Sequence, residues 1–188
     1  MEKYVFEALY IMRFEDDAIQ RMKLRYRDMV EYPFTTLWED WRIGGSGGGT
    51  INHAWSGGPL TIMSQYAAGV APEKIGYEVY HVLPQMGPLK SIKATVPSVR
   101  GDIKVEMKKT DASFTMKLTS PAETTAIAGI PKDAIGKIVS ISVNGKSIWR
   151  NGQTTDSCER VEFRSEDEHY YRFSLEQGTW SFKATSGQ

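Results

Sequence analysis

The spacing of apolar residues changes once along the chain, and this change constrains the fold more than any other feature. Over residues 1–70 apolar side chains recur at intervals of three and four, which is the period of an amphipathic helix. The first series is Val5, Ala8, Leu9 and Met12, and the second is Ile19, Met22, Tyr26 and Met29. Asp16 or Asp17 is a candidate N-cap for the second helix. A third helix is predicted over residues 59–69.

The start of that third helix has its own signals. Ser56 is a candidate N-cap. Pro59 suits the first turn, because no amide donor is needed there.

After residue 70 the chain breaks into short runs that favour β-strands, separated by turn signals. The predicted strands are 77–83, 89–96, 102–109, 113–119, 124–130, 138–143, 146–150, 160–164, 169–175 and 179–185. Asn144-Gly145 between two of these runs is a strong signal for a two-residue hairpin. Short strands at this spacing indicate an antiparallel sandwich or barrel.

The two periods predict an α+β chain in which helices are followed by an antiparallel β-sandwich. Residues 71–78, which contain Pro72 and Gly76, read as a linker. We therefore place the domain boundary between residues 1–72 and residues 73–188. Because the helices are too few to close a core by themselves, we expect them to be covered by further helices or by self-association of the chain.

Composition and charge argue against several classes of protein. Lysine plus arginine and aspartate plus glutamate number 23 each, so neither a nucleic acid nor a membrane surface is expected as a partner. No apolar run reaches the roughly 20 residues of a transmembrane helix, and no signal peptide is evident. The compartment stays open between bacterial periplasm or exterior and cytoplasm.

Metal and cofactor chemistry is not indicated. The three histidines show no metal-ligand spacing, and Cys158 is the single cysteine and lacks a nearby histidine. The glycine run at 44–49 lacks the Lys-Ser/Thr ending of a phosphate-binding loop. We expect no metal and no cofactor.

The segment TTLWEDW, residues 35–41, places one carboxylate between two indoles. Glu39 lies between Trp38 and Trp41. One interpretation is a capping box, in which Glu39 reaches back to the amide of Thr36. The other is a sugar site, since indoles offer apolar platforms to sugar rings and a neighbouring carboxylate can activate a water.

The segment INHAWSGGP, residues 51–59, adds an imidazole and a third indole. His53 and Trp55 are the residues concerned. A histidine just before a helix usually makes a local hydrogen bond, and this alternative stands beside a role in ligand binding.

Together these two segments resemble the end of the catalytic barrel in bacterial α-L-rhamnosidases. The later stretches YEVYHVLPQMGPLKSIKATVPSVRGDIKVEMKK and FTMKLTSPAETTAIAGIP are similar to the C-terminal sandwich of the same family. The resemblance covers residues 1–131 and weakens beyond them.

The resemblance implies an (α/α)6 catalytic barrel, of which residues 1–72 would be a part, followed by a β-sandwich. It also implies inverting hydrolysis of terminal α-L-rhamnosides, with one glutamic acid that protonates the leaving oxygen and a second that activates water. The second role falls on Glu39, and His53 would contact the bound sugar. Trp38, Trp41 and Trp55 are expected to line the pocket.

One part of the family pattern has no counterpart in this chain. The general acid belongs to a segment well before TTLWE, and residues 1–34 contain no matching acidic motif. We therefore expect a C-terminal portion that supplies the base without the acid and is inactive alone. The alternative is a non-catalytic carbohydrate-binding or structural sandwich, whose candidate surface aromatics are Trp149, Tyr170, Tyr171 and Trp180. Aromatics at alternating strand positions are more often part of a core, and this interpretation stands beside the first.

Overall fold

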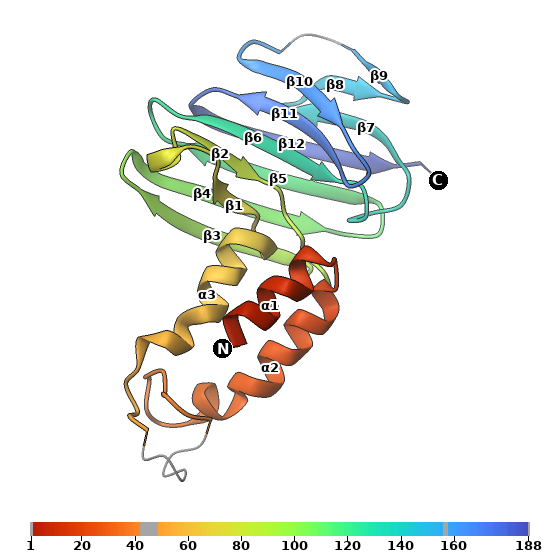
Figure 1. Ribbon diagram of the computed structural model, residues 1–188. Coiled ribbons are helices and arrows are strands. Elements are labelled where there is room, and N and C mark those ends of the chain that lie inside the picture. Colours follow the sequence, from red (N-terminus) through yellow and green to blue (C-terminus); the bar gives the residue numbers. More distant parts are fainter. Residues whose placement is uncertain (1, 42–48, 156–157, 188) are drawn as a thin grey trace. The chain divides into compact units, whose positions relative to one another are not determined.

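The structure is a computed structural model that describes residues 2–41, 49–155 and 158–187. The chain divides into two compact units, Met1–Met63 and Ser64–Gln188. The first unit is helical and the second is built from strands (Figure 1). This arrangement confirms the predicted α+β class, with helices followed by a β-sandwich. The assignment of residues 1–72 to a catalytic barrel and of 73–188 to a separate domain stays a prediction.

The helical unit contains two long helices and a group of short ones. Its elements are α1 (Glu2–Ile11), α2 (Glu15–Glu31), η1 (Ala54–Gly57) and α3 (Gly58–Ile62), and η2 (Met63–Ala67) follows directly. α1 packs against both α2 and α3. The third predicted helix therefore exists but is short, and it continues as a π-helical turn in η2.

The buried faces of the two long helices follow the sequence pattern to different extents. On α2, Ile19, Met22 and Met29 are buried as their spacing predicts. On α1 the buried side chains are Phe6 and Tyr10. The predicted face of α1 is wrong, because Val5, Ala8 and Met12 are exposed and Leu9 is only partly buried. The apolar residues of α1 surround most of the helix, so periodicity alone could not select one face.

The predicted helix caps are also replaced by other residues. Phe14 occupies the N-cap position of α2 and makes no side-chain cap, while Asp16 and Asp17 lie in the first turn. Carboxylates in a first turn still favour the helix through its dipole. At η1 the cap is His53, and Pro59 lies in the first turn of α3 as predicted.

The second unit contains two β-sheets. Its strands are β1 (Val70–Pro72), β2 (Val79–Val82), β3 (Ser91–Ser98), β4 (Gly101–Lys109), β5 (Ser113–Ser120), β6 (Thr125–Pro131), β7 (Ile138–Val143), β8 (Lys146–Arg150), β9 (Gln153–Thr154), β10 (Val161–Glu166), β11 (Tyr170–Leu175) and β12 (Gly178–Ser186), with η3 (Ile75–Tyr77) between β1 and β2. One sheet has the order β1-β2-β6-β11-β10 and the other β3-β4-β5-β12-β7-β8-β9. All pairs are antiparallel except β2 with β6.

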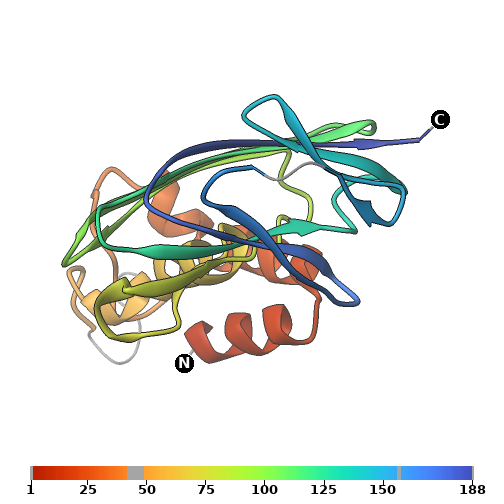
Figure 2. The same ribbon diagram turned by 90° about the horizontal axis from the view of Figure 1, so that it is seen from above.

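Side chains of both sheets share one hydrophobic core. Phe114, Leu118 and Phe182 enter it from the larger sheet, and Tyr80 and Phe173 enter it from the smaller one. The strands alternate buried and exposed residues, most regularly in β4 and β12. Figure 2 shows the two layers from above. The strand unit is therefore a sandwich with inward apolar and outward polar positions.

All ten predicted strands are present, and two short strands were missed. β1 lies where the sequence indicated a helix end and a linker, and it pairs with β2. β9 is only two residues long. At the predicted hairpin, Asn144 and Gly145 have φ of 48° and 81°, as a type I′ turn requires.

Candidate functional site

The predicted site residues lie on two chain segments that hydrogen bonds hold side by side. The Glu39 N–H donates to the Thr50 carbonyl at 2.8 Å, and the His53 N–H donates to the Leu37 carbonyl at 2.8 Å. The Thr50 N–H in turn donates to Glu39 Oε2 at 2.9 Å. The glycine run between the segments, apart from Gly49, lies outside the described residues.

These contacts decide between the two interpretations of Glu39. The described residues directly after Thr36, residues 37–41, form no helix, and the carboxylate of Glu39 accepts a hydrogen bond from the Thr50 N–H. The capping-box interpretation is therefore wrong. A glycine-rich segment cannot propagate the helix that a capping box would start, because glycine loses more backbone entropy than any other residue when it enters a helix.

Trp38 is a buried anchor of this region. It is 3% exposed, and its ring meets that of Tyr32 edge-on at a centroid distance of 5.3 Å. The hydroxyl of Ser56 donates to the Trp38 carbonyl at 2.5 Å. Ser56 thus ties the two segments together and does not cap a helix as the sequence suggested.

Trp41 and Trp55 are more exposed than Trp38. The ring of Trp41 stands edge-on to Tyr26 at 5.1 Å, and the Arg25 guanidinium lies 5.7 Å from it. Trp55 is 63% exposed, and its indole Nε1 donates to the Glu39 carbonyl at 3.1 Å. Trp55 therefore holds the backbone of Glu39 while it leaves most of its own ring open to solvent.

His53 makes the local contacts that its sequence position suggested. Its Nδ1 accepts a weak hydrogen bond from the Trp55 N–H at 3.4 Å. Its ring lies 4.5 Å from that of Trp55. These contacts fix the imidazole beside an exposed indole, and its role toward a sugar stays a prediction.

A cavity of about 170 Å³ brings part of the predicted set together. Its walls are formed by Glu2, Lys3, Val5, Tyr26, Met29, Glu39, Trp41, Trp55 and Ser56. His53 and Trp38 are not among them. Complete small-molecule sites usually measure about 300–1,000 Å³, so this cavity has the size of part of a site.

The cavity contains a second carboxylate that the sequence did not single out. Glu2 accepts hydrogen bonds from Arg21 Nε at 2.8 Å and Nη2 at 2.7 Å. The hydrogen bond from Arg21 holds the pKa of Glu2 below its ordinary value, although burial opposes this shift. Glu2 is therefore ionised near neutral pH. Only the α1–α2 packing could reveal this pair, since its members lie far apart in the sequence.

The Glu2–Arg21 pair gives a pH-dependent stability. A carboxylate with a lowered folded-state pKa stabilises the fold above its unfolded pKa, and this contribution disappears as the pH falls through the folded value. Glu2→Gln should cost about 1 kcal/mol at pH 7 and less at pH 3, which lies below the ordinary pKa of a glutamate. Urea unfolding at both pH values measures this, with the exposed Glu31→Gln as control. An equal cost at pH 3 would contradict the assignment.

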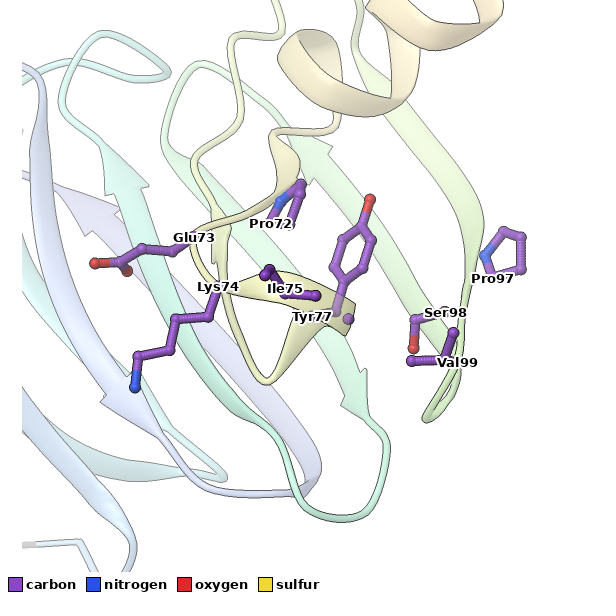
Figure 3. Close-up of a pocket in the computed structure, with 9 residues that line it drawn as sticks. Pro72, Glu73, Lys74, Ile75, Tyr77, Pro97, Ser98 and Val99 are labelled. Atoms are coloured by element: carbon purple, nitrogen blue, oxygen red, sulfur yellow. The ribbon is translucent and has the colours of Figure 1, made fainter.

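A larger cavity of about 610 Å³ lies in the strand unit (Figure 3). Its residues are Pro72, Glu73, Lys74, Ile75, Gly76, Tyr77, Pro97, Ser98 and Val99. The charged ends of Glu73 and Lys74 point away from the Tyr77 ring in Figure 3. Glu73 instead meets His81, with 3.4 Å between Oε2 and Nε2. This cavity is apolar and does not place an acid beside an aromatic plate.

The aromatic residues proposed as sugar platforms on the sandwich are buried. Trp149, Tyr170 and Trp180 are each 4% exposed, and Tyr171 is 9% exposed. Their interpretation as surface platforms is wrong. Trp149, Tyr171 and Trp180 belong to the hydrophobic core. Tyr170 directly precedes Tyr171 in β11 and so points to the opposite face, where its hydroxyl donates to the Pro84 carbonyl at 3.1 Å. Sugar binding by the sandwich would need another surface.

Residues 2–41, 49–155 and 158–187 contain no group of three or more His, Cys, Asp or Glu side chains placed to hold a metal ion. None of their helices combines the length and the apolar character needed to cross a bilayer.

Comparison with known proteins identifies relatives of the chain. Residues 69–143 match the family model described as the bacterial alpha-L-rhamnosidase C-terminal domain. No curated protein sequence matches the chain.

Solved structures extend the likeness to the fold of nearly the whole chain. The alpha-L-rhamnosidase from Dictyoglumus thermophilum matches 98% of this chain with a TM-score of 0.80 and 22% identity. Rhamnosidases from Streptomyces avermitilis, solved with L-rhamnose, and Aspergillus terreus match 79% and 90% of it, with TM-scores of 0.62 and 0.63 and identities of 22% and 14%.

The matched region is a small part of each enzyme. The chain spans 20%, 14% and 17% of the lengths of the three solved enzymes, in that order. The match at residues 69–143 confirms the resemblance seen in the sequence. Over those residues the chain matches the C-terminal domain of bacterial alpha-L-rhamnosidases, and it has the fold of the C-terminal part of such an enzyme.

Proposed function

We propose that the chain is the C-terminal portion of an inverting glycoside hydrolase that releases terminal α-L-rhamnose. Glu39 would be the general base, and the general acid would come from a part of the enzyme outside these residues. The observation that carries the proposal is the cavity in which Glu39 meets the indoles of Trp41 and Trp55. Aromatic plates can hold the apolar face of a sugar ring, and the carboxylate beside them can supply one of the two carboxyl groups that hydrolysis uses.

The hydrogen bonds of Glu39 suit a base. Its Oε2 accepts from the Thr50 N–H, and the indole of Trp55 holds its carbonyl. These two contacts fix the backbone and one carboxylate oxygen. Among the described residues Oε1 accepts no hydrogen bond, so it is available to take a proton from a water. A base positioned in this way contributes about 10²–10⁴-fold to a rate.

The second carboxylate of the cavity is unsuited to the role of acid. A general acid must carry a proton at the start of the reaction. Arg21 engages both carboxylate oxygens of Glu2 and lowers its pKa, so Glu2 stays ionised. In inverting enzymes the acid stands about 6.5–9.5 Å from the base, across the bond that is cleaved. We place it on another segment of the enzyme.

The exposed apolar side chains of the helices support a larger helical assembly. On α1 and α2, Tyr4, Ile11, Leu24 and Val30 are between 66% and 80% exposed. We propose that these residues pack against further helices of an (α/α)6 barrel, of which residues 1–72 form part. Self-association through the same helices stays a prediction for the chain on its own.

A replacement experiment tests the proposal. The segment of the Dictyoglumus thermophilum enzyme that matches this chain is exchanged for residues 1–188, and turnover of 4-nitrophenyl α-L-rhamnopyranoside is measured. We expect turnover from the chimera and none from the chain alone, because the acid is supplied only by the rest of the enzyme.

Two outcomes would contradict the proposal. Turnover by the chain alone would show that it contains its own acid. A chimera that melts cooperatively, binds L-rhamnose and yet has no turnover would show that the chain supplies no base.

A further inference from the structure

The outward face of the larger sheet is polar and carries several lysines. The strands β4, β5, β12 and β7 are neighbours in this sheet. Their register places outward residues in rows: Lys108, Thr115, Lys183 and Ser142 form one row, and Glu106, Lys117 and Ser181 form the next. The rows gather three lysines and three hydroxyls within a few strand spacings.

The three lysines of this basic face, Lys108, Lys117 and Lys183, outnumber the one carboxylate that lines the same cavity, Glu106. All three are exposed, and none forms an ion pair with any described residue. The nearby carboxylate, Glu106, is engaged by Lys93 at 3.0 Å. The hydrogen bond from Lys93 holds the pKa of Glu106 below its ordinary value, and the nearby charges of Lys117 and Lys108 lower it further. The face therefore keeps an excess of positive charge near neutral pH.

The basic face is also hollowed. A cavity of about 430 Å³ is lined by all three lysines together with Glu106, Thr115, Ser142 and Ser181. Phe182 is the one aromatic residue in its lining, and it is 2% exposed because it points into the core. The cavity thus offers three ammonium groups and three hydroxyls to a ligand, with one carboxylate that Lys93 engages, and no aromatic plate.

This chemistry discriminates between classes of sugar. A neutral sugar is held largely by stacking on an aromatic plate, which this face does not offer. A sugar with a carboxylate gains from the lysines, and its hydroxyls match those of the threonine and the serines. Neighbouring strands lie about 4.8 Å apart, so Lys108 and Lys183, two strands apart, stand about 10 Å apart at the backbone. That spacing suits a chain with repeated negative charges.

We infer that the hollow bounded by Lys108, Lys117 and Lys183 binds an anionic oligosaccharide through its carboxylate groups. This site would hold an acidic glycan on the sandwich, separate from the Glu39 cavity. The choice of a saccharide among polyanions rests on the proposed function. The preference for an anion rests only on the charges of the three lysines. A nucleic acid is disfavoured because the chain as a whole has a formal net charge of zero at pH 7 and a pI near 6.8.

The experiment measures binding of polygalacturonate to the whole chain by isothermal titration calorimetry, with neutral galactan as the comparison polymer. The triple variant K108Q/K117Q/K183Q should lose affinity for polygalacturonate about tenfold or more. The control K23Q/K90Q/K137Q removes the same charge from exposed lysines outside the cavity and should leave affinity within about twofold. Raising NaCl from 50 to 500 mM should also weaken binding at least about tenfold.

Several results would overturn the inference. Equal binding of polygalacturonate and galactan would show that the carboxylates do not matter. Equal losses of affinity in the two triple variants would show that the three lysines of the cavity are not special. Single-stranded DNA of matched charge that binds as tightly as polygalacturonate would show that the face does not select a saccharide. Glu39→Gln should leave this binding unchanged. The calorimetry tests glycan binding by the sandwich, and turnover by the chimera tests the proposed hydrolase function. A negative result in one experiment can therefore be told apart from a negative result in the other.

Discussion

Glu39→Gln in the chimera should lower kcat for the rhamnoside by about 10²–10⁴-fold, with KM changed by only a few-fold. Glutamine keeps the shape of the side chain and can still accept from the Thr50 N–H, so the local hydrogen bond survives. The amide cannot take a proton from water. The loss therefore falls on the chemical step and not on binding, and steady-state kinetics separates the two.

Asp40→Asn is the matched control for this experiment. Asp40 is the neighbouring acid and is exposed, and it does not line the Glu39 cavity. The same change of charge should therefore leave kcat within about threefold. Turnover of the Glu39 variant within a few-fold of the parent chimera would exclude Glu39 as the base.

Gly69→Ala should destabilise the strand unit by on the order of 3 kcal/mol. Gly69 has φ of 73°, where an alanine pays about 1–2 kcal/mol. A Cβ at this position would also overlap the backbone of Leu83, whose N–H donates to the Gly69 carbonyl at 3.0 Å. Backbone cannot move aside as a flexible side chain can, and overpacking of this kind costs a further 1–3 kcal/mol or so.

Gly145→Ala separates the cost of the positive φ from the cost of the steric overlap with Leu83. Gly145 has a similar φ of 81°, but no atom lies within 4 Å of an added Cβ. Its substitution should cost only the backbone term, about 1–2 kcal/mol. Urea unfolding followed by far-ultraviolet circular dichroism compares the variants. If both substitutions cost the same, the close approach of Gly69 to Leu83 does not matter for stability.

Strand periodicity predicted the sandwich well because its strands alternate. In β4 and β12 every second residue is apolar and buried, and this period of two can be read without any knowledge of the partner strands. β1 could not be found in this way. It has three residues, and its strand character depends on pairing with β2.

The candidate site was predicted only where its residues are close in sequence. Glu39, Trp41 and Trp55 belong to two neighbouring motifs, and all three line the same cavity. The burial of Trp38 and the participation of Glu2 depend on the packing of α1, α2 and the segment after them. Such long-range contacts carry no periodic signal.

The sequence by itself determined the elements, their order and the chemical groups available, because local propensity and side-chain period depend on near neighbours. Its first 34 residues contain no match to the acidic motif that the resemblance implies, and the absence of the general acid stays a prediction. Only the tertiary structure decided which aromatic residues line a cavity and which are buried in the core. It also decided that Arg21 engages Glu2 and that three lysines from three strands line one cavity. These are distances between segments far apart in the chain, and the packing of the whole unit sets them.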